Sequence, residues 1–131
     1  MLNPNVKILH IEDDDGHALL LKLNLEEIGF KNELIRFTNG DEFFEYLLDN
    51  FTSKNTYIVL LDIRLPKYDG ITILKLIKQN KKYRNFKIIM VSTSDNPVEI
   101  KETIKCGANC YYTKPVNYEE LLAKIEKIAE N

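Results

Sequence analysis

Short apolar runs rich in β-branched residues recur along the chain, separated by segments with helical periodicity. The clearest runs are residues 6–11, 57–61, 87–91 and 110–113, and a weaker run at 33–37 alternates in polarity. Runs of this length and composition predict β-strands. The first three clear runs are too continuously apolar for a sheet with one face in water. They predict a parallel sheet covered on both faces, with residues 33–37 as an edge strand.

Between these runs, apolar side chains recur at steps of three and four residues, which predicts helices. Each stripe begins near residues that favour helix N-termini, and Gly29 and Gly107 suit the ends of the first and fourth helices. Pro97 suits a first turn, because its missing N–H would be unpaired there in any case. The expected starts are Asp14 or Asp15; Asn39, Gly40 and Asp41; Asp69 and Gly70; Asp95 and Asn96; and Asn117 with Glu120.

The order strand, helix is repeated five times, with connections too long for hairpins. Such units almost always cross over right-handed, so the simplest arrangement is an α/β, doubly wound (βα)5 three-layer sandwich. A chain of 131 residues suits one hydrophobic core. Since the sequence has no low-complexity linker, we expect residues 1–131 to form a single domain with no output domain.

Composition and charge argue against several classes of protein. The chain has 18 basic and 20 acidic residues, and it lacks the basic excess that binds a nucleic-acid backbone. No segment approaches the roughly 20 apolar residues that span a bilayer, and the N-terminal run is too short for a signal peptide. We therefore expect a cytoplasmic protein that binds neither nucleic acid nor membrane. Cys106 and Cys110 are expected to be ordinary thiols.

Charged and polar residues follow the predicted strands. Glu12 and Asp13 follow the first strand, Asp62 the third, Ser92 the fourth and Lys114 the fifth. Because the carboxyl ends of parallel strands lie at one edge of the sheet, we expect these side chains to share a pocket. Carboxylates within roughly 5 Å repel by about 3 kcal/mol per pair at an effective dielectric of 20, so the cluster needs a cation. Oxygen ligands without His or Cys favour Mg2+.

These residue types suit phosphoryl transfer. Asp62 is the expected nucleophile, and its product would be an acyl phosphate, which hydrolyses and so suits a signal that must decay. Mg2+ and Lys114 would spread the charge of the equatorial oxygens, and Ser92 would donate a hydrogen bond to one of them. Neither His10 nor His17 is spaced for a metal site or a catalytic triad, and we expect both to be structural or solvated.

Four segments, KILHIEDD, VLLDIRLPKYDGI, IIMVSTS and GANCYYTKP, resemble the successive motifs of bacterial response-regulator receiver domains. The resemblance extends over about residues 6–129 and implies a flavodoxin-like sheet with strand order 2-1-3-4-5. It gives Asp62 the role of phosphoacceptor, and Ser92 and Tyr111 those of switch residues. It further implies a cis peptide bond before Pro115. The implied Mg2+ ligands are Glu12, Asp13, Asp62 and the backbone carbonyl of Arg64.

By this resemblance the chain is a phosphoacceptor signalling switch of a two-component system. It would not be an enzyme beyond accepting its own phosphoryl group and slowly losing it. A histidine kinase or a phosphotransfer protein would phosphorylate Asp62, and Tyr111 would turn inward as Ser92 moves toward the phosphate. The fourth helix, fifth strand and fifth helix would then bind a downstream protein or, in a homodimer, a second copy.

The chain most resembles the small stand-alone regulators that serve phytochrome-type histidine kinases. This narrower resemblance rests on Glu12, which replaces Asp at the first acidic position, on the LPKYDG loop and on the VSTS run. Arg64 departs from the smaller residues common at its position, and its side chain would either cover the site or touch the phosphate, which leaves the lifetime of the phosphorylated state open.

Three other functions fit the sequence less well. A constitutive pseudo-receiver, which keeps the fold without being phosphorylated, would be expected to lack Asp62, Asp13 or Lys114, and all three are present. An aspartyl phosphatase needs a second acid close to Asp62, but position 64 is Arg. A flavin-binding protein of this architecture needs a hydroxyl-rich loop after the first strand, where this chain has acids.

Overall fold

The structure, a computed structural model, describes residues 2–130 as five strands that alternate with five helices. The strands are β1 (Val6–Ile11), β2 (Leu34–Phe37), β3 (Thr56–Leu61), β4 (Lys87–Ser92) and β5 (Cys110–Thr113). The helices are α1 (Asp15–Glu27), α2 (Gly40–Asn50), α3 (Gly70–Gln79), α4 (Pro97–Lys105) and α5 (Tyr118–Ala129). The predicted alternation is confirmed, and each strand boundary lies within one residue of its prediction. Within residues 2–130, no helix combines the length and the apolar character that crossing a membrane requires.

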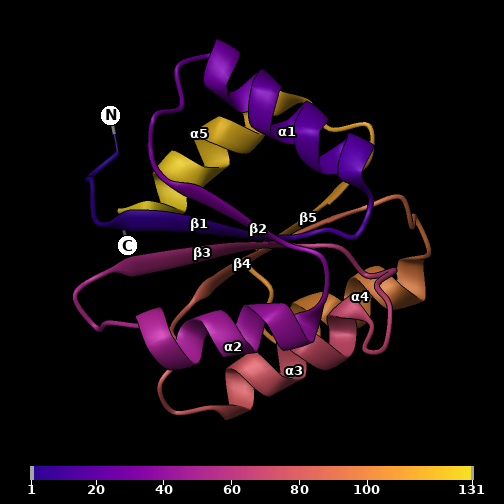
Figure 1. Ribbon diagram of the computed structural model, residues 1–131. Helices are drawn as coiled ribbons and strands as arrows, with labels where there is room; N and C mark the ends of the chain where they lie inside the picture. The colour runs from indigo at the N-terminus through magenta and orange to yellow at the C-terminus, as the bar shows by residue number, and fades with distance from the viewer. Residues whose placement is uncertain (1, 131) are drawn as a thin grey trace.

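The strands form one parallel sheet in the order β2-β1-β3-β4-β5, which confirms the flavodoxin-like arrangement. Figure 1 shows α1 and α5 on one face of this sheet and α2, α3 and α4 on the other. The chain runs outward from β1 to the edge strand β2 and then returns to β3 on the far side of β1. The strand order therefore reverses between β1 and β3, where ligands bind in sheets of this type.

Two apolar clusters fill the space between the sheet and its helices. Val59 packs with Phe43 of α2 in one cluster, and Ile58 packs with Leu25 of α1 in the other. Adjacent strand residues point to opposite faces, and both Ile58 and Val59 are completely buried. A strand covered on both sides has to be apolar throughout, which explains the continuous runs of β1, β3 and β4. The edge strands β2 and β5 are only partly buried, as predicted for β2.

Polar side chains fix where the helices begin. The Asp14 carboxylate accepts a hydrogen bond from the N–H of His17 at 2.9 Å and caps α1. Gly29 and Gly107 have φ values of 103° and 110°, and they follow α1 and α4 as expected for glycine stops. The other N-caps, each accepting a main-chain hydrogen bond, are Asn39, Asp69, Asn96 and Asn117. The predicted helix starts are thus confirmed.

Candidate functional site

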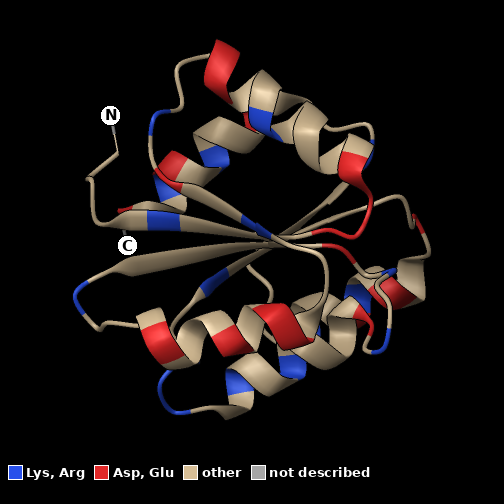
Figure 2. Cartoon of the chain, in the orientation of Figure 1, with Lys and Arg blue, Asp and Glu red and all other residues tan. Residues whose placement is uncertain are grey.

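The carboxyl ends of β1 and β3 bring three carboxylates together, in the acidic segments drawn red in Figure 2. One carboxylate oxygen from each of Glu12, Asp13 and Asp62 lies within 4.8 Å of the others. Glu12 and Asp62 are 1% and 6% exposed, whereas Asp13 is open to solvent. The predicted convergence of these acids is therefore confirmed. Two carboxylates this deeply buried need positive charge close by.

Lys114 supplies part of that charge. Its ammonium donates hydrogen bonds to Glu12 Oε1 and to Asp62 Oδ2, the second at 3.2 Å. Burial alone would lower the pKa of Lys114, but the bond to Glu12 and the charges of Asp62 and Glu12 raise it overall. Burial raises the pKa of Glu12, and the bond from Lys114 offsets part of this effect. The sequence predicted that Lys114 shares a pocket with Asp62 and Glu12, and the structure shows that its ammonium binds both carboxylates. The Lys114–Pro115 peptide bond is cis, as predicted.

Main-chain contacts hold Asp62 in place at the end of β3. Its N–H donates to the carbonyl of Ile11 at 3.3 Å, and its Oδ1 accepts from the N–H of Arg64 at 3.2 Å. Gly70, the first residue of α3, lies against the Asp62 carbonyl. A Cβ on Gly70 would lie 2.1 Å from that oxygen, so the close approach of α3 to the end of β3 requires glycine.

Ser92 and Tyr111 lie on the two strands beyond β3. Ser92 is completely buried, and its Oγ accepts a hydrogen bond from the N–H of Ser94 at 3.3 Å. Its carbonyl accepts from the N–H of Lys114 at 2.8 Å, which joins the ends of β4 and β5. The half-buried Tyr111 donates its hydroxyl to the Ser94 carbonyl at 2.6 Å. The expected inward turn of Tyr111 would therefore start from a hydroxyl already bound to the β4–α4 loop.

Two contacts near the site were not anticipated from the sequence. His17 Nδ1 lies 3.1 Å from the Lys114 ammonium, although we expected His17 to be structural or solvated. The Arg64 guanidinium makes two hydrogen bonds of 2.9 Å to Glu99 on α4. Both contacts join segments that are far apart along the chain, so spacing does not reveal them. Their only signal in the sequence is that His17 and Arg64 follow soon after strand ends.

The donor set fits a hard divalent cation. The three carboxylates and the one ammonium sum to −2 when all are ionised, and the cluster contains no His or Cys ligand. Mg2+ prefers carboxylate oxygens and keeps several waters, for which the exposed side at Asp13 leaves room. Arg64, whose carbonyl is the fourth predicted ligand, adjoins the cluster through its N–H bond to Asp62.

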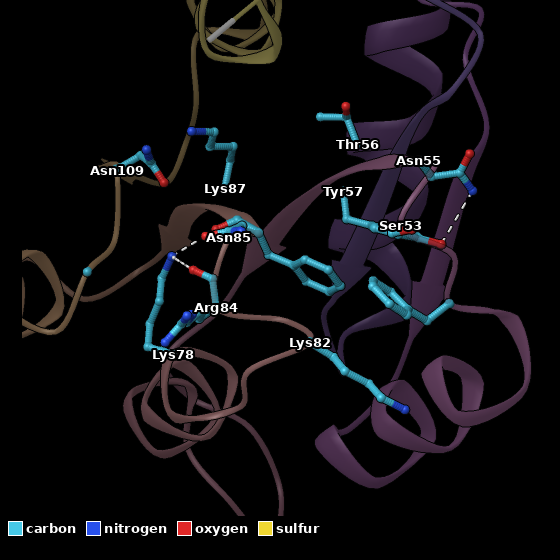
Figure 3. A pocket seen from close by; sticks show the side chains of 13 residues that line it. Ser53, Asn55, Thr56, Tyr57, Lys78, Lys82, Arg84, Asn85, Lys87 and Asn109 are labelled. Atoms are coloured by element: carbon cyan, nitrogen blue, oxygen red, sulfur yellow. Dashed lines mark hydrogen bonds between the residues drawn. The ribbon is translucent and has the colours of Figure 1, made fainter.

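A cavity of about 520 Å³ lies at the opposite edge of the sheet, where β3 and β4 begin (Figure 3). Lys78, Lys82, Arg84 and Lys87 line it, and none of its lining residues is acidic. The Lys78 ammonium donates to the carbonyls of Arg84 and Phe86 at 3.1 and 2.8 Å, as the dashed lines show. This cavity has the wrong charge for a cation. The chemistry expected from the strand ends is therefore at the other edge.

Comparisons with known proteins agree with this geometry. A family model described as the response regulator receiver domain matches residues 8–126. The probable methanogenesis regulatory protein FilR2 of Methanothrix harundinacea is 30% identical over 125 residues, which are 94% of this chain and 81% of that protein. The chain spans about half the length of several other curated relatives, such as the response regulator protein GraR of Staphylococcus epidermidis and the sensory transduction protein BceR of Halalkalibacterium halodurans.

Solved structures show the same fold. A response regulator receiver domain from Rhodospirillum rubrum is 40% identical with a TM-score of 0.76, over 94% of this chain and 90% of that one. The phosphorylated cyanobacterial phytochrome response regulator RcpA is 29% identical with a TM-score of 0.75, over 95% and 91%. Receivers of other kinds match at comparable identity, so the narrower assignment to phytochrome-type regulators stays a prediction.

Proposed function

The chain belongs to the response regulator receiver family of two-component systems, and from this premise we propose that Asp62 is its phosphoacceptor. Phosphorylation and Mg2+ binding are general features of the family. One observation carries the proposal. Asp62 is 6% exposed, accepts a hydrogen bond from Lys114, and lies within 4.8 Å of Glu12 and Asp13. Buried carboxylates that share one ammonium are costly for folding, and such arrangements gather at functional sites.

Glu12, Asp13, Asp62 and the backbone carbonyl of Arg64 would hold Mg2+. The bound ion would supply positive charge to the oxygens of the transferring phosphoryl group. The chain itself provides a second positive charge through Lys114, whose raised pKa keeps its ammonium protonated at neutral pH. Both charges face an anionic group that would otherwise be repelled by the three carboxylates.

In the proposed reaction an Asp62 oxygen attacks phosphorus in line with the donor's leaving group. The new O–P bond forms as the donor's bond to phosphorus breaks, and the leaving group takes up a proton from solvent. Lys114 contacts one phosphoryl oxygen. Ser92, whose Oγ accepts a hydrogen bond from the Ser94 N–H, turns its hydroxyl to donate a hydrogen bond to another phosphoryl oxygen. The acyl phosphate later reacts with water, which releases inorganic phosphate and returns Asp62 to its carboxylate.

The proposed donor is a histidine kinase or a phosphotransfer protein, and the proposed output is a changed protein-binding surface. Movement of Ser92 would alter the β4–α4 loop, where the Ser94 carbonyl holds the Tyr111 hydroxyl at 2.6 Å. The face formed by α4, β5 and α5 would then bind a downstream protein or a second copy of the chain. A shift between two existing conformations is enough, provided that the partner prefers one of them.

A constitutive pseudo-receiver is the alternative. Such a protein would keep this fold and bind its partner whether or not Asp62 carried a phosphoryl group. The presence of Asp13, Asp62 and Lys114 around one point favours the phosphorylated switch.

Incubation with Mg2+ and acetyl phosphate, followed by intact-protein mass measurement, tests the proposal. We expect the wild type to gain one phosphoryl group and Asp62→Asn to gain none. Asp41→Asn is the matched control, because Asp41 is an acid of α2 that binds Lys67 and lies outside the acidic cluster. Its adduct should equal that of the wild type. A wild type without an adduct, or an equal adduct on Asp62→Asn, contradicts the proposal.

A further inference from the structure

Arg64 joins the loop after β3 to the first turn of α4. Two of its guanidinium nitrogens donate to the two carboxylate oxygens of Glu99, each at 2.9 Å. The Ser94 hydroxyl donates to the same carboxylate at 2.6 Å. These hydrogen bonds, from Ser94 and then from Arg64, lower the pKa of Glu99, so the pair is ionic at neutral pH. The two parallel bonds fix the direction of the Arg64 side chain.

The residues around this ion pair also contact the phosphorylation site through their main chains. The Arg64 N–H donates to Asp62 Oδ1 at 3.2 Å. The Ser94 N–H donates to Ser92 Oγ at 3.3 Å, and the Ser94 carbonyl accepts from the Tyr111 hydroxyl at 2.6 Å. A continuous series of polar contacts therefore runs from the proposed phosphoacceptor to α4 and on to Tyr111.

We propose that Arg64 and Glu99 form a second switch contact, in addition to Ser92 and Tyr111. In the unphosphorylated protein, Arg64 ties the first turn of α4 to the site. Once Asp62 carries a phosphoryl group, the Arg64 guanidinium leaves Glu99 and binds the phosphoryl oxygens, which releases α4. This inference rests on the proposed phosphorylation of Asp62.

Electrostatics favours this exchange of partners. The Arg64 side chain is 61% exposed, so solvent screens its attraction to Glu99, whose side chain is 21% exposed. A phosphoryl group on Asp62 would carry a charge of about −1.5 to −2 on three acceptor oxygens. The planar guanidinium binds phosphate with the same two-pronged geometry that it uses for carboxylate. Since Arg64 is already bonded to Asp62 through its N–H, the stronger anion would appear beside it.

Two other ion pairs provide a contrast. Lys67 pairs with Asp41 at 2.9 Å, and Lys75 of α3 pairs with Glu102 of α4 at 3.2 Å. The hydrogen bonds of these four side chains within residues 2–130 reach neither Asp62 nor Ser94. Lys75→Ala therefore loosens α4 without touching the site, which makes it the matched control.

The first measurement is the rate of phosphorylation by limiting acetyl phosphate with Mg2+. Glu99→Gln keeps an acceptor for Ser94 but no longer holds Arg64 by charge. We expect this variant to be phosphorylated about two- to five-fold faster than the wild type, the range that the loss of an exposed ion pair supports. In an Arg64→Ala background, Glu99→Gln should have no effect, because the side chain that it frees is gone. Lys75→Ala should match the wild type.

The second measurement is amide hydrogen exchange over residues 94–100, first in the unphosphorylated protein without Mg2+. Arg64→Ala and Glu99→Gln should both exchange faster than the wild type there, by about two- to five-fold. Phosphorylation of the wild type should produce the same increase.

The inference would be overturned if Glu99→Gln changed the phosphorylation rate equally in the wild-type and Arg64→Ala backgrounds. If the wild type were phosphorylated normally in that experiment, the proposed function would remain intact. Unchanged exchange over residues 94–100 upon phosphorylation would also overturn the inference; it would leave Asp62 as the phosphoacceptor but count against the proposed change in the β4–α4 loop. If the wild type takes up no phosphoryl group, the proposed function is refuted. The proposed movement of the Arg64 guanidinium from Glu99 to the phosphoryl oxygens is then refuted as well. The exchange rates of the unphosphorylated variants would still report whether the ion pair holds α4.

Discussion

His10 should make the stability of the fold depend on pH between neutrality and pH 5. The side chain lies within β1, is 2% exposed, and has no hydrogen-bond partner for Nδ1 in the part of the chain that the structure describes. Burial, together with the positive charges of Lys114 and Arg36, lowers the pKa of His10 from its ordinary 6.5 to about 3. The folded protein therefore keeps this imidazole neutral at pH values where the unfolded chain protonates it.

The sign and size of this change in the free energy of unfolding follow from proton linkage. A folded-state pKa below that of the unfolded state means that the unfolded chain binds more protons, so stability falls as pH decreases from 6.5 toward 3. At pH 5.0 the two pKa values give a loss of RT ln[(1 + 10^1.5)/(1 + 10^−2)], which is about 2 kcal/mol. At pH 7.5 the same expression gives less than about 0.1 kcal/mol.

Urea denaturation at pH 7.5 and pH 5.0 measures this loss. His10→Leu replaces the imidazole with an apolar side chain that cannot titrate, so its free energy of unfolding should fall by about 2 kcal/mol less than that of the wild type. Comparing each variant with itself at two pH values removes the packing cost of leucine. His17→Gln removes the only other histidine and shows how much pH dependence His17 contributes. Equal pH dependence in wild type and His10→Leu would refute the reasoning.

Gly70→Ala should lower the free energy of unfolding by more than about 3 kcal/mol, because its Cβ would lie 2.1 Å from the Asp62 carbonyl oxygen. Urea denaturation checks this, and a loss below about 1 kcal/mol would contradict it. Asn39→Ala should cost about 1 kcal/mol, since Asn39 caps α2 with a hydrogen bond of 2.9 Å; an unchanged thermal midpoint would argue against this. Mg2+ at about a hundred times its Kd should stabilise the wild type by about 2.7 kcal/mol. Asp13→Asn should lose most of that gain, and an equal gain would place the ion elsewhere.

The sheet and its helices could be predicted because their signals are local and repeated. In β3, neighbouring residues such as Ile58 and Val59 are buried on opposite faces, so the whole strand is apolar and stands out in the sequence. Caps such as Asn39 and Asp69 accept hydrogen bonds from N–H groups only a few residues further along the chain, so they can be recognised from the local sequence as well. The order of the strands is different. It depends on contacts between distant segments, and it came from the resemblance of the four motifs to receiver domains.

The acidic cluster could be predicted for a topological reason, since a parallel sheet gathers its carboxyl ends at one edge. The contact partners of Lys114, Arg64 and His17 could not be predicted. These contacts join segments that are distant along the chain, and they depend on which neighbouring element offers a polar group. Sequence reasoning therefore found Lys114 but missed its bond to Glu12, and it left the direction of Arg64 open.

The position of Lys114 suggests why metal binding and phosphorylation should support each other. Its side chain is 12% exposed, and its ammonium serves Glu12 and Asp62 at the same time. When these carboxylates also bind a cation, Lys114 keeps a positive charge but loses part of its compensation, which is unfavourable for a buried ion. A phosphoryl group on Asp62 would restore an anionic partner to the ammonium. We therefore expect Mg2+ to bind more tightly to the phosphorylated protein, and linkage requires that Mg2+ favour phosphorylation to the same extent.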